Sequence, residues 1–109
     1  MTKLIGYKIV KKDLTSSFMN GYASVQYKIG KWVYPKKDCG PLAVFTNLND
    51  AKENFRNNLH NKIFRCKYKI SHISHLANKY RIMPAYFLPY GTDFAESVKL
   101  LEEIEIERI

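Results

Sequence analysis

Long hydrophobic runs and cysteines are both scarce in this sequence of 109 residues. No segment approaches the ~20 consecutive apolar residues that a membrane-spanning helix requires, so we expect no membrane partner. The two cysteines, Cys39 and Cys66, are too few for the disulfide framework of a small secreted protein. The first residues alternate lysines with apolar side chains, which is not typical of a signal peptide. We therefore expect an intracellular, cytoplasmic protein.

Motifs of the common enzyme classes are also lacking. The sequence contains no glycine-rich phosphate-binding loop, no Gly-x-Ser-x-Gly turn around a nucleophile and no His-Glu-x-x-His zinc helix. We therefore expect no cofactor and no catalytic residue, and a binding protein is favoured over an enzyme.

Zinc ligands are present in number but not in a recognised spacing. Cys39, Cys66, His72 and His75 supply the four sulfur and imidazole ligands that a zinc ion takes. The two cysteines are far apart, whereas zinc signatures contain closely spaced pairs. We predict no metal site, and the sequence leaves open whether these four side chains meet.

Acidic residues are scarce over most of the chain. Residues 1–92 contain sixteen Lys and Arg against four Asp and Glu, a net charge of +12, whereas residues 93–109 carry a net charge of −4. Such a surplus of positive charge favours solubility and attraction to polyanions.

The pattern of apolar residues predicts one α+β domain over residues 1–109. Leu48, Ala51, Phe55 and Leu59 recur at helical spacing, which predicts a helix over about 48–59. The N-cap of this helix is left open among Thr46, Asn47 and Asn49. Alternating residues predict strands over 3–12, 22–29 with an extension at 32–34 after Gly30, 42–45, 62–70 and 97–107. We expect a mainly antiparallel, twisted sheet of about five strands with the helix on one face.

The segment from residue 93 onward satisfies two patterns. Asp93 and Glu96 have the spacing of a helix capping box. Val98, Leu100, Ile104 and Ile106 alternate with charged residues, and β-branched residues favour a strand. We predict a helical turn near 93–96 that is followed by the strand over 97–107.

The most regular alternation places a basic stripe on one face of the strand over 62–70. The stripe consists of Arg65, Lys67 and Lys69, and the opposite face is apolar. Cations hold a phosphate backbone, so we predict that the stripe, together with Lys8 and Lys28 of other strands, binds nucleic acid or another polyanion. Tyr7, Tyr27 and Tyr68 are expected on the buried side of the sheet. The alternative is that the glutamates of the last strand neutralise the stripe. These are Glu103, Glu105 and Glu107.

A protein partner is the second candidate. Aromatic residues near prolines suggest irregular surface segments, where partners often bind. The predicted interaction surface consists of Trp32, Tyr34, Tyr86, Phe87 and Tyr90.

Two resemblances accompany these patterns. The runs Gly40-Pro-Leu-Ala-Val-Phe45 followed by Ala51, and Gly91-Thr92 followed by Ala95 and Val98-Lys-Leu100, resemble short patterns of small microbial and viral proteins without a known activity, which implies a fold class alone. Thr15-Ser16-Ser17, together with either Glu103-Ile-Glu105 or Glu105-Ile-Glu107, resembles parts of the ADP-ribosyltransferase pattern, in which such residues help to hold NAD. That resemblance implies an NAD-binding enzyme as a minor alternative, although no arginine lies on the first strand as in that family.

Overall fold

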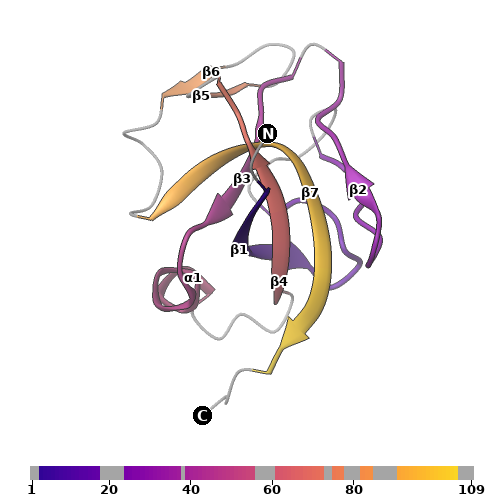
Figure 1. The fold of residues 1–109 in the computed structure, drawn as a ribbon, viewed down its shortest axis with the longest axis vertical. Coiled ribbons are helices and arrows are strands. Elements are labelled where there is room, and N and C mark those ends of the chain that lie inside the picture. The colour runs from indigo at the N-terminus through magenta and orange to yellow at the C-terminus, as the bar shows by residue number, and fades with distance from the viewer. Residues whose placement is uncertain are drawn as a thin grey trace.

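The computed structural model describes residues 3–17, 24–37, 39–55, 61–72, 75–77, 82–84 and 91–105. Its elements follow the chain as β1 (Lys3–Lys11), β2 (Trp32–Val33), β3 (Leu42–Phe45), α1 (Leu48–Phe55), β4 (Asn61–Ile70), β5 (His75–Ala77), β6 (Ile82–Pro84) and β7 (Thr92–Ile104). The predicted α+β class and the mainly antiparallel sheet are confirmed (Figure 1). Within the described residues, the helix is neither long enough nor apolar enough to span a membrane.

The main sheet curls until four of its strands, β7, β3, β1 and β4, form a closed ring of pairings. Its order is β2-β7-β3-β1-β4, all the pairings are antiparallel, and β7 also pairs with β4. Strand β7 makes this possible because its first residues pair with β3, whereas later residues pair with β4 and β2. Figure 1 shows β7 as a long arc across the sheet. Strands β5 and β6 pair separately as a two-stranded sheet.

Strand β7 begins where the sequence predicted a helical turn, and that prediction was wrong. Residues 92–95 pair with β3, with Ala95 opposite Leu42 and Phe94 opposite Ala43. The carboxylate of Asp93, predicted to cap a helix, instead accepts a hydrogen bond of 2.7 Å from the Tyr68 hydroxyl. A full ladder of backbone hydrogen bonds and the burial of Phe94 and Ala95 outweigh one isolated helical turn.

The register between β4 and β7 shifts at one extra residue. Arg65 lies opposite Glu102 and Cys66 lies opposite Leu100, so Leu101 is the additional residue of a bulge. On one side of the bulge the outward positions of β7 include Lys99, and on the other side they include Glu102. A second shift lies between Lys69 and Ile70.

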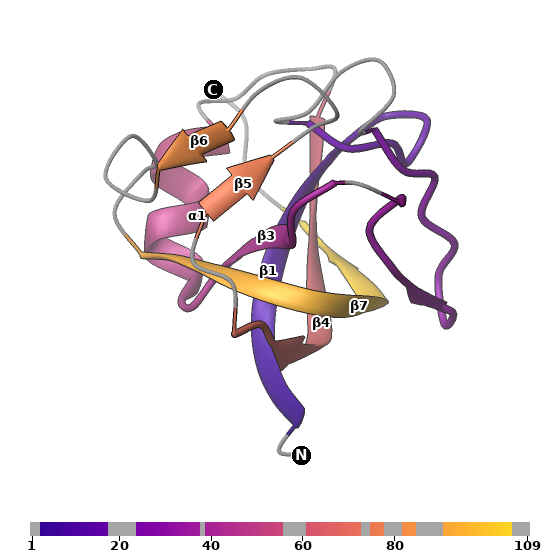
Figure 2. The same cartoon turned by 90° about the horizontal axis from the view of Figure 1, so that it is seen from above.

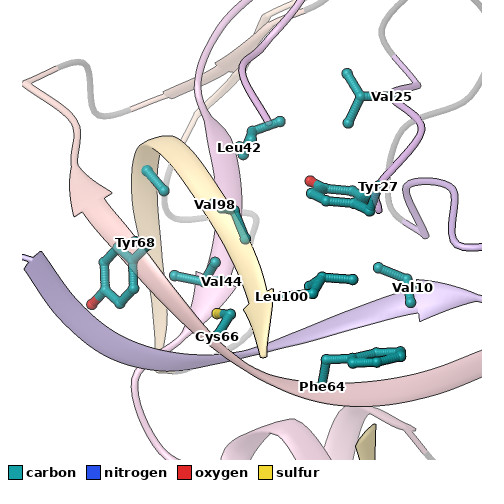
Figure 3. Packing of buried hydrophobic residues seen from close by; sticks show 11 residues of the cluster. Val10, Val25, Tyr27, Leu42, Val44, Phe64, Cys66, Tyr68, Val98 and Leu100 are labelled. Carbon is teal, nitrogen blue, oxygen red and sulfur yellow. The ribbon is translucent and has the colours of Figure 1, made fainter. Parts of the chain in front are cut away.

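The inside of the curled sheet is the larger apolar core. Side chains from β1, β3, β4 and β7 fill it together with Val25 and Tyr27 (Figure 3). Tyr27, Cys66 and Leu100 are fully buried there. Gly6 is required at this point of β1, because a Cβ atom at that position would lie 2.8 Å from the Phe45 carbonyl oxygen and 2.8 Å from the Tyr68 ring.

The segment before β2 is not the predicted strand. Its described part, residues 24–29, makes one isolated bridge, between Gln26 and Thr15. Val25 and Tyr27 point into the core as the alternation predicts, but Ile29 is 56% exposed. The chain then turns at Gly30, whose φ of +82° is left-handed, and this turn prevents continuation of a ladder.

Helix α1 packs on the outside of the sheet over one end of β1 and β4 (Figure 2). Ala51 and Phe55 face Ile9, Phe45 and Ile63 in a second, smaller core. The side chain of Asn47 caps the helix, since its Oδ1 atom accepts a hydrogen bond of 2.9 Å from the Asp50 backbone. The helix thus covers part of the outer sheet face.

Candidate polyanion-binding surface

The basic stripe lies on the outer face of β4, beyond the end that α1 covers. Phe64, Cys66 and Tyr68 point into the core, so the intervening residues point outward. Residues directly opposite one another in an antiparallel pair share a face. Tyr7 and Ile5 of β1, which lie opposite Arg65 and Lys67, therefore belong to this outer face. Tyr7 was predicted on the buried side with Tyr27 and Tyr68, and the structure places only the latter two inside.

One member of the stripe is neutralised. The Arg65 Nε atom donates a hydrogen bond of 2.7 Å to the Glu102 carboxylate. Glu103 contacts Lys62 instead, at 3.6 Å between Nζ and Oε1. The expectation that glutamates of the last strand face the stripe therefore holds only at Arg65, with Glu102 in place of Glu103. Glu105 is exposed, and Glu107 lies outside the described residues.

The other two members of the stripe meet a third lysine. Lys67 lies directly opposite Lys99 of β7, and Lys69 is two residues further along β4. We call Lys67, Lys69 and Lys99 the lysine cluster. Among the residues that the structure describes, no carboxylate oxygen lies within 4 Å of the ammonium group of any of the three. Lys67 is exposed, whereas Lys69 and Lys99 are half-buried.

Trp32 borders the lysine cluster. It lies opposite Lys99 on the other side of β7, so the two side chains share the outer face. The Lys69 Nζ atom lies 5.1 Å from the centroid of the Trp32 ring, and the Lys99 Nζ atom lies 5.9 Å from it. Both distances are typical of cation–π contacts. The only tryptophan of the chain therefore contacts two members of the lysine cluster.

Lys8, which was predicted to belong to the polyanion site, lies inside the curled sheet. Its side chain is only 3% exposed, and its Nζ atom donates a hydrogen bond of 2.6 Å to the Ala43 carbonyl oxygen. The Nζ atom also lies 5.5 Å from the centroid of the Tyr27 ring. Burial lowers the pKa of Lys8 to about 8. Lys8 lies opposite the core residue Phe64 and therefore on the core face of β1, so it does not reach the lysine cluster.

Lys28 is exposed, as the prediction requires, but it lies in the segment before the turn at Gly30 rather than on a strand. Of the predicted protein-interaction surface, Tyr34 is 53% exposed and Trp32 is half-buried. The remaining members lie outside the described residues. They are Tyr86, Phe87 and Tyr90.

The residues that resemble the ADP-ribosyltransferase pattern have local roles. The Thr15 hydroxyl donates to the Asp13 carboxylate at 2.6 Å, and the Ser17 hydroxyl donates to the Ile9 carbonyl at 2.9 Å. Ser16 is buried, and its Oγ atom accepts a hydrogen bond from the Val25 backbone. The serine run therefore fixes the chain after β1.

The four potential zinc ligands are in different settings. Cys66 is buried in the core, Cys39 is half-buried in the loop before β3, and His72 is exposed after β4. The side chain of His75 lies outside the described set. Among the residues that the structure describes, no three ligand-type side chains are grouped as a metal ion would require.

Lys99 is the member of the cluster that sequence reasoning missed. Val98 and Leu100 on either side are apolar, so a period of two already indicates that Lys99 points outward. Its position opposite Lys67 depends on the register of β7, which the bulge at Leu101 sets.

No protein-family model matches this chain, and comparison with curated proteins and with solved structures finds no similar protein.

Proposed function

We propose that this protein is a binding module for a polyanion, with nucleic acid as the expected class, and that the lysine cluster is its contact surface. The observation that carries the proposal is the direct opposition of Lys67 and Lys99 without a neutralising carboxylate within 4 Å among the described residues. Like charges directly opposite on neighbouring strands destabilise a sheet. A chain of phosphates would relieve that repulsion by placing negative charge between the lysines.

The geometry of the strands supports a linear ligand. Lys67 and Lys69 are two positions apart on β4, which corresponds to about 6.7 Å along the strand. Lys99 lies on the neighbouring strand, at the usual spacing of about 4.8 Å. The three ammonium groups thus form a compact group on an extended surface. Such a group suits successive phosphates better than one buried anion.

Fluorescence anisotropy with labelled RNA and DNA tests the proposal. We expect binding at low salt that weakens steeply as salt rises, because phosphate contacts release condensed counterions. Lys67→Ala and Lys99→Ala should each weaken binding and lower the slope of log K against log salt by about 0.7–0.9. Lys12→Ala is the matched control, since Lys12 is an exposed lysine just past the opposite end of β1.

Two results would refute this function. One is the absence of binding at low salt. The other is binding that depends equally on Lys12 and on Lys67, because the attraction would then reflect overall charge rather than the lysine cluster.

A protein partner is a second candidate, because apolar side chains are exposed near β2. Tyr34 is 53% exposed and Ile29 is 56% exposed on either side of Trp32. Tyrosine is enriched at protein interfaces. Light scattering of the purified protein, with Tyr34→Ser as the variant, tests whether this surface joins two copies; a monomer at all concentrations argues against self-association.

A further inference from the structure

We propose that the polyanion is single-stranded nucleic acid and that one of its bases stacks on Trp32. This inference rests on the proposed function and specifies the ligand of the same surface. A surface of lysines alone attracts any polyanion, but proteins that hold single strands combine cations for the backbone with an aromatic ring for the bases. The lysine cluster and Trp32 supply both parts on one face of the sheet.

The position of Trp32 supports this assignment. Most aromatic side chains that the structure describes are buried, including Tyr27, Phe45 and Phe64. Trp32 is instead half-buried on a strand of two residues, with the ammonium groups of Lys69 and Lys99 over its ring. A base that stacks on the ring would take the place of an ammonium group over it, and the displaced lysine would then contact the phosphates of the same strand.

The backbone holds Trp32 in place without the help of a ligand. Strand β2 pairs with β7 at two positions, and the Gly30 amide donates a hydrogen bond of 2.8 Å to the Leu100 carbonyl. Val33, the next residue, packs against the main core. The ring is therefore carried by an anchored strand, which reduces the entropy lost when a base stacks on it.

Duplexes fit the same surface less well. Their bases are already stacked and paired, so they cannot cover the Trp32 ring without the cost of unpairing. Their phosphates would still contact the lysine cluster. The inference thus predicts that single strands bind more tightly than duplexes of the same length, and that both bind more weakly as salt rises.

Intrinsic fluorescence tests the stacking directly, because Trp32 is the only tryptophan. The ligands are oligo(U) and oligo(dT) of about 12 nucleotides, which is within the usual site size, a duplex of the same length, and inorganic polyphosphate. We expect both single strands to quench Trp32 strongly, and polyphosphate to bind without comparable quenching. A difference between oligo(U) and oligo(dT) would identify which nucleic acid is preferred.

Variants separate the role of the ring from that of charge. Trp32→Leu should weaken single-strand binding by roughly 5- to 100-fold, which is the usual effect of losing one stacking residue, and should leave polyphosphate binding unchanged. Trp32→Phe should retain most of the affinity in an anisotropy assay, which shows that the strand carrying residue 32 still folds. Lys67→Ala should weaken the binding of all the ligands.

The outcomes distinguish the two proposals. Equal affinity for single strands, duplex and polyphosphate, without quenching of Trp32, would overturn the stacking inference and leave polyanion binding standing. Single-strand binding that Trp32→Leu does not weaken would overturn it as well. A failure of every ligand to bind at low salt would remove the proposed function and this inference together.

Discussion

Lys67 of β4 and Lys99 of β7 occupy directly opposite positions on the outer face of the sheet, and the only carboxylate paired with the basic stripe among the described residues is that of Glu102 at Arg65. Two neighbouring positions of one ladder therefore differ in electrostatic character. At Arg65 the cross-strand pair is an ion pair, and at Lys67 it is a repulsive pair. This contrast leads to a prediction in which stability and binding change in opposite directions.

Lys67→Glu should stabilise the fold and weaken polyanion binding. The new carboxylate would face Lys99 and lie near Lys69, which replaces repulsion by attraction. We expect the free energy of unfolding to rise by roughly 0.2–1 kcal/mol at low salt, and the gain to shrink at high salt. Urea unfolding at two salt concentrations measures the first effect, and anisotropy with labelled RNA measures the second.

The control for this variant is Lys12→Glu, which changes the net charge equally at an exposed position away from the lysine cluster. It should change stability less and leave most of the binding intact. If Lys67→Glu were no more stable than the wild type at low salt, the repulsion inferred between Lys67 and Lys99 would be wrong.

The buried amine of Lys8 should make stability rise with pH. Burial lowers its pKa to about 8 from 10.5, so between these values the unfolded chain binds a proton that the folded chain has lost. Stability then increases as pH rises through this window. Relative to Lys8→Met, the wild type should gain on the order of 3 kcal/mol in free energy of unfolding from pH 7 to above pH 10.5.

The free energy of unfolding of the wild type must be compared with that of Lys8→Met at each pH, because other buried groups also titrate at high pH. Burial raises the pKa of the Cys66 thiol to about 12 and raises that of the Tyr27 hydroxyl, and both shifts make stability fall at high pH. These contributions are common to both proteins and largely cancel in the comparison. Lys12→Met, at an exposed site, should give a curve parallel to that of the wild type. If the curve of stability against pH for Lys8→Met were also parallel to that of the wild type, the pKa of Lys8 would be the same in the folded and the unfolded chain.

Gly6→Ala should destabilise the protein more than Gly30→Ala. The added methyl group at residue 6 would meet the Phe45 carbonyl and the Tyr68 ring at 2.8 Å, inside a filled core. We expect a loss of roughly 1–3 kcal/mol or more in the free energy of unfolding. At Gly30 nothing lies within 4 Å, so only the left-handed backbone opposes the change, at about 1 kcal/mol. Urea unfolding compares the two, and equal losses would contradict the close packing at Gly6.

The two thiols should differ in reactivity. Cys66 is fully buried and its pKa is raised, so its reactive thiolate form is rare. Cys39 is half-buried in a loop. A chromogenic disulfide reagent should therefore modify one thiol quickly in the native protein and two in denaturant, and Cys39→Ser should abolish the quick phase. Two quick phases in the native wild type would contradict the burial of Cys66.

Local periodicity was sufficient to predict most of the fold. The alternation over 62–70 placed Phe64, Cys66 and Tyr68 inside and the basic stripe outside, and the helical spacing of Leu48, Ala51 and Phe55 placed α1 correctly. In each case one face of the element is buried, so the sequence pattern directly reflects the packing.

Predictions that depended on contacts between distant segments were less successful. The capping-box spacing at Asp93 is a local signal, and pairing with β3 overrides it. The alternation in β1 was interpreted with Tyr7 inside and Lys8 outside, and nothing local shows that Lys8 instead faces the core, where a carbonyl group of β3 accepts its hydrogen bond. The lysine cluster likewise requires the order β2-β7-β4, which no single segment contains.

The extra residue at position 101 has a consequence for how this protein can change in evolution. Side chains alternate between the two faces of a strand, so a one-residue insertion or deletion within the paired part moves every later side chain to the opposite face. Leu101 is the extra residue of a bulge, so its loss would close the bulge and leave Glu102 opposite Arg65 and Leu100 opposite Cys66. Homologous chains should therefore tolerate varied residue types and even a deletion at this site, whereas a one-residue deletion elsewhere between Val98 and Glu103 would move the charged residues of β7 to the other face.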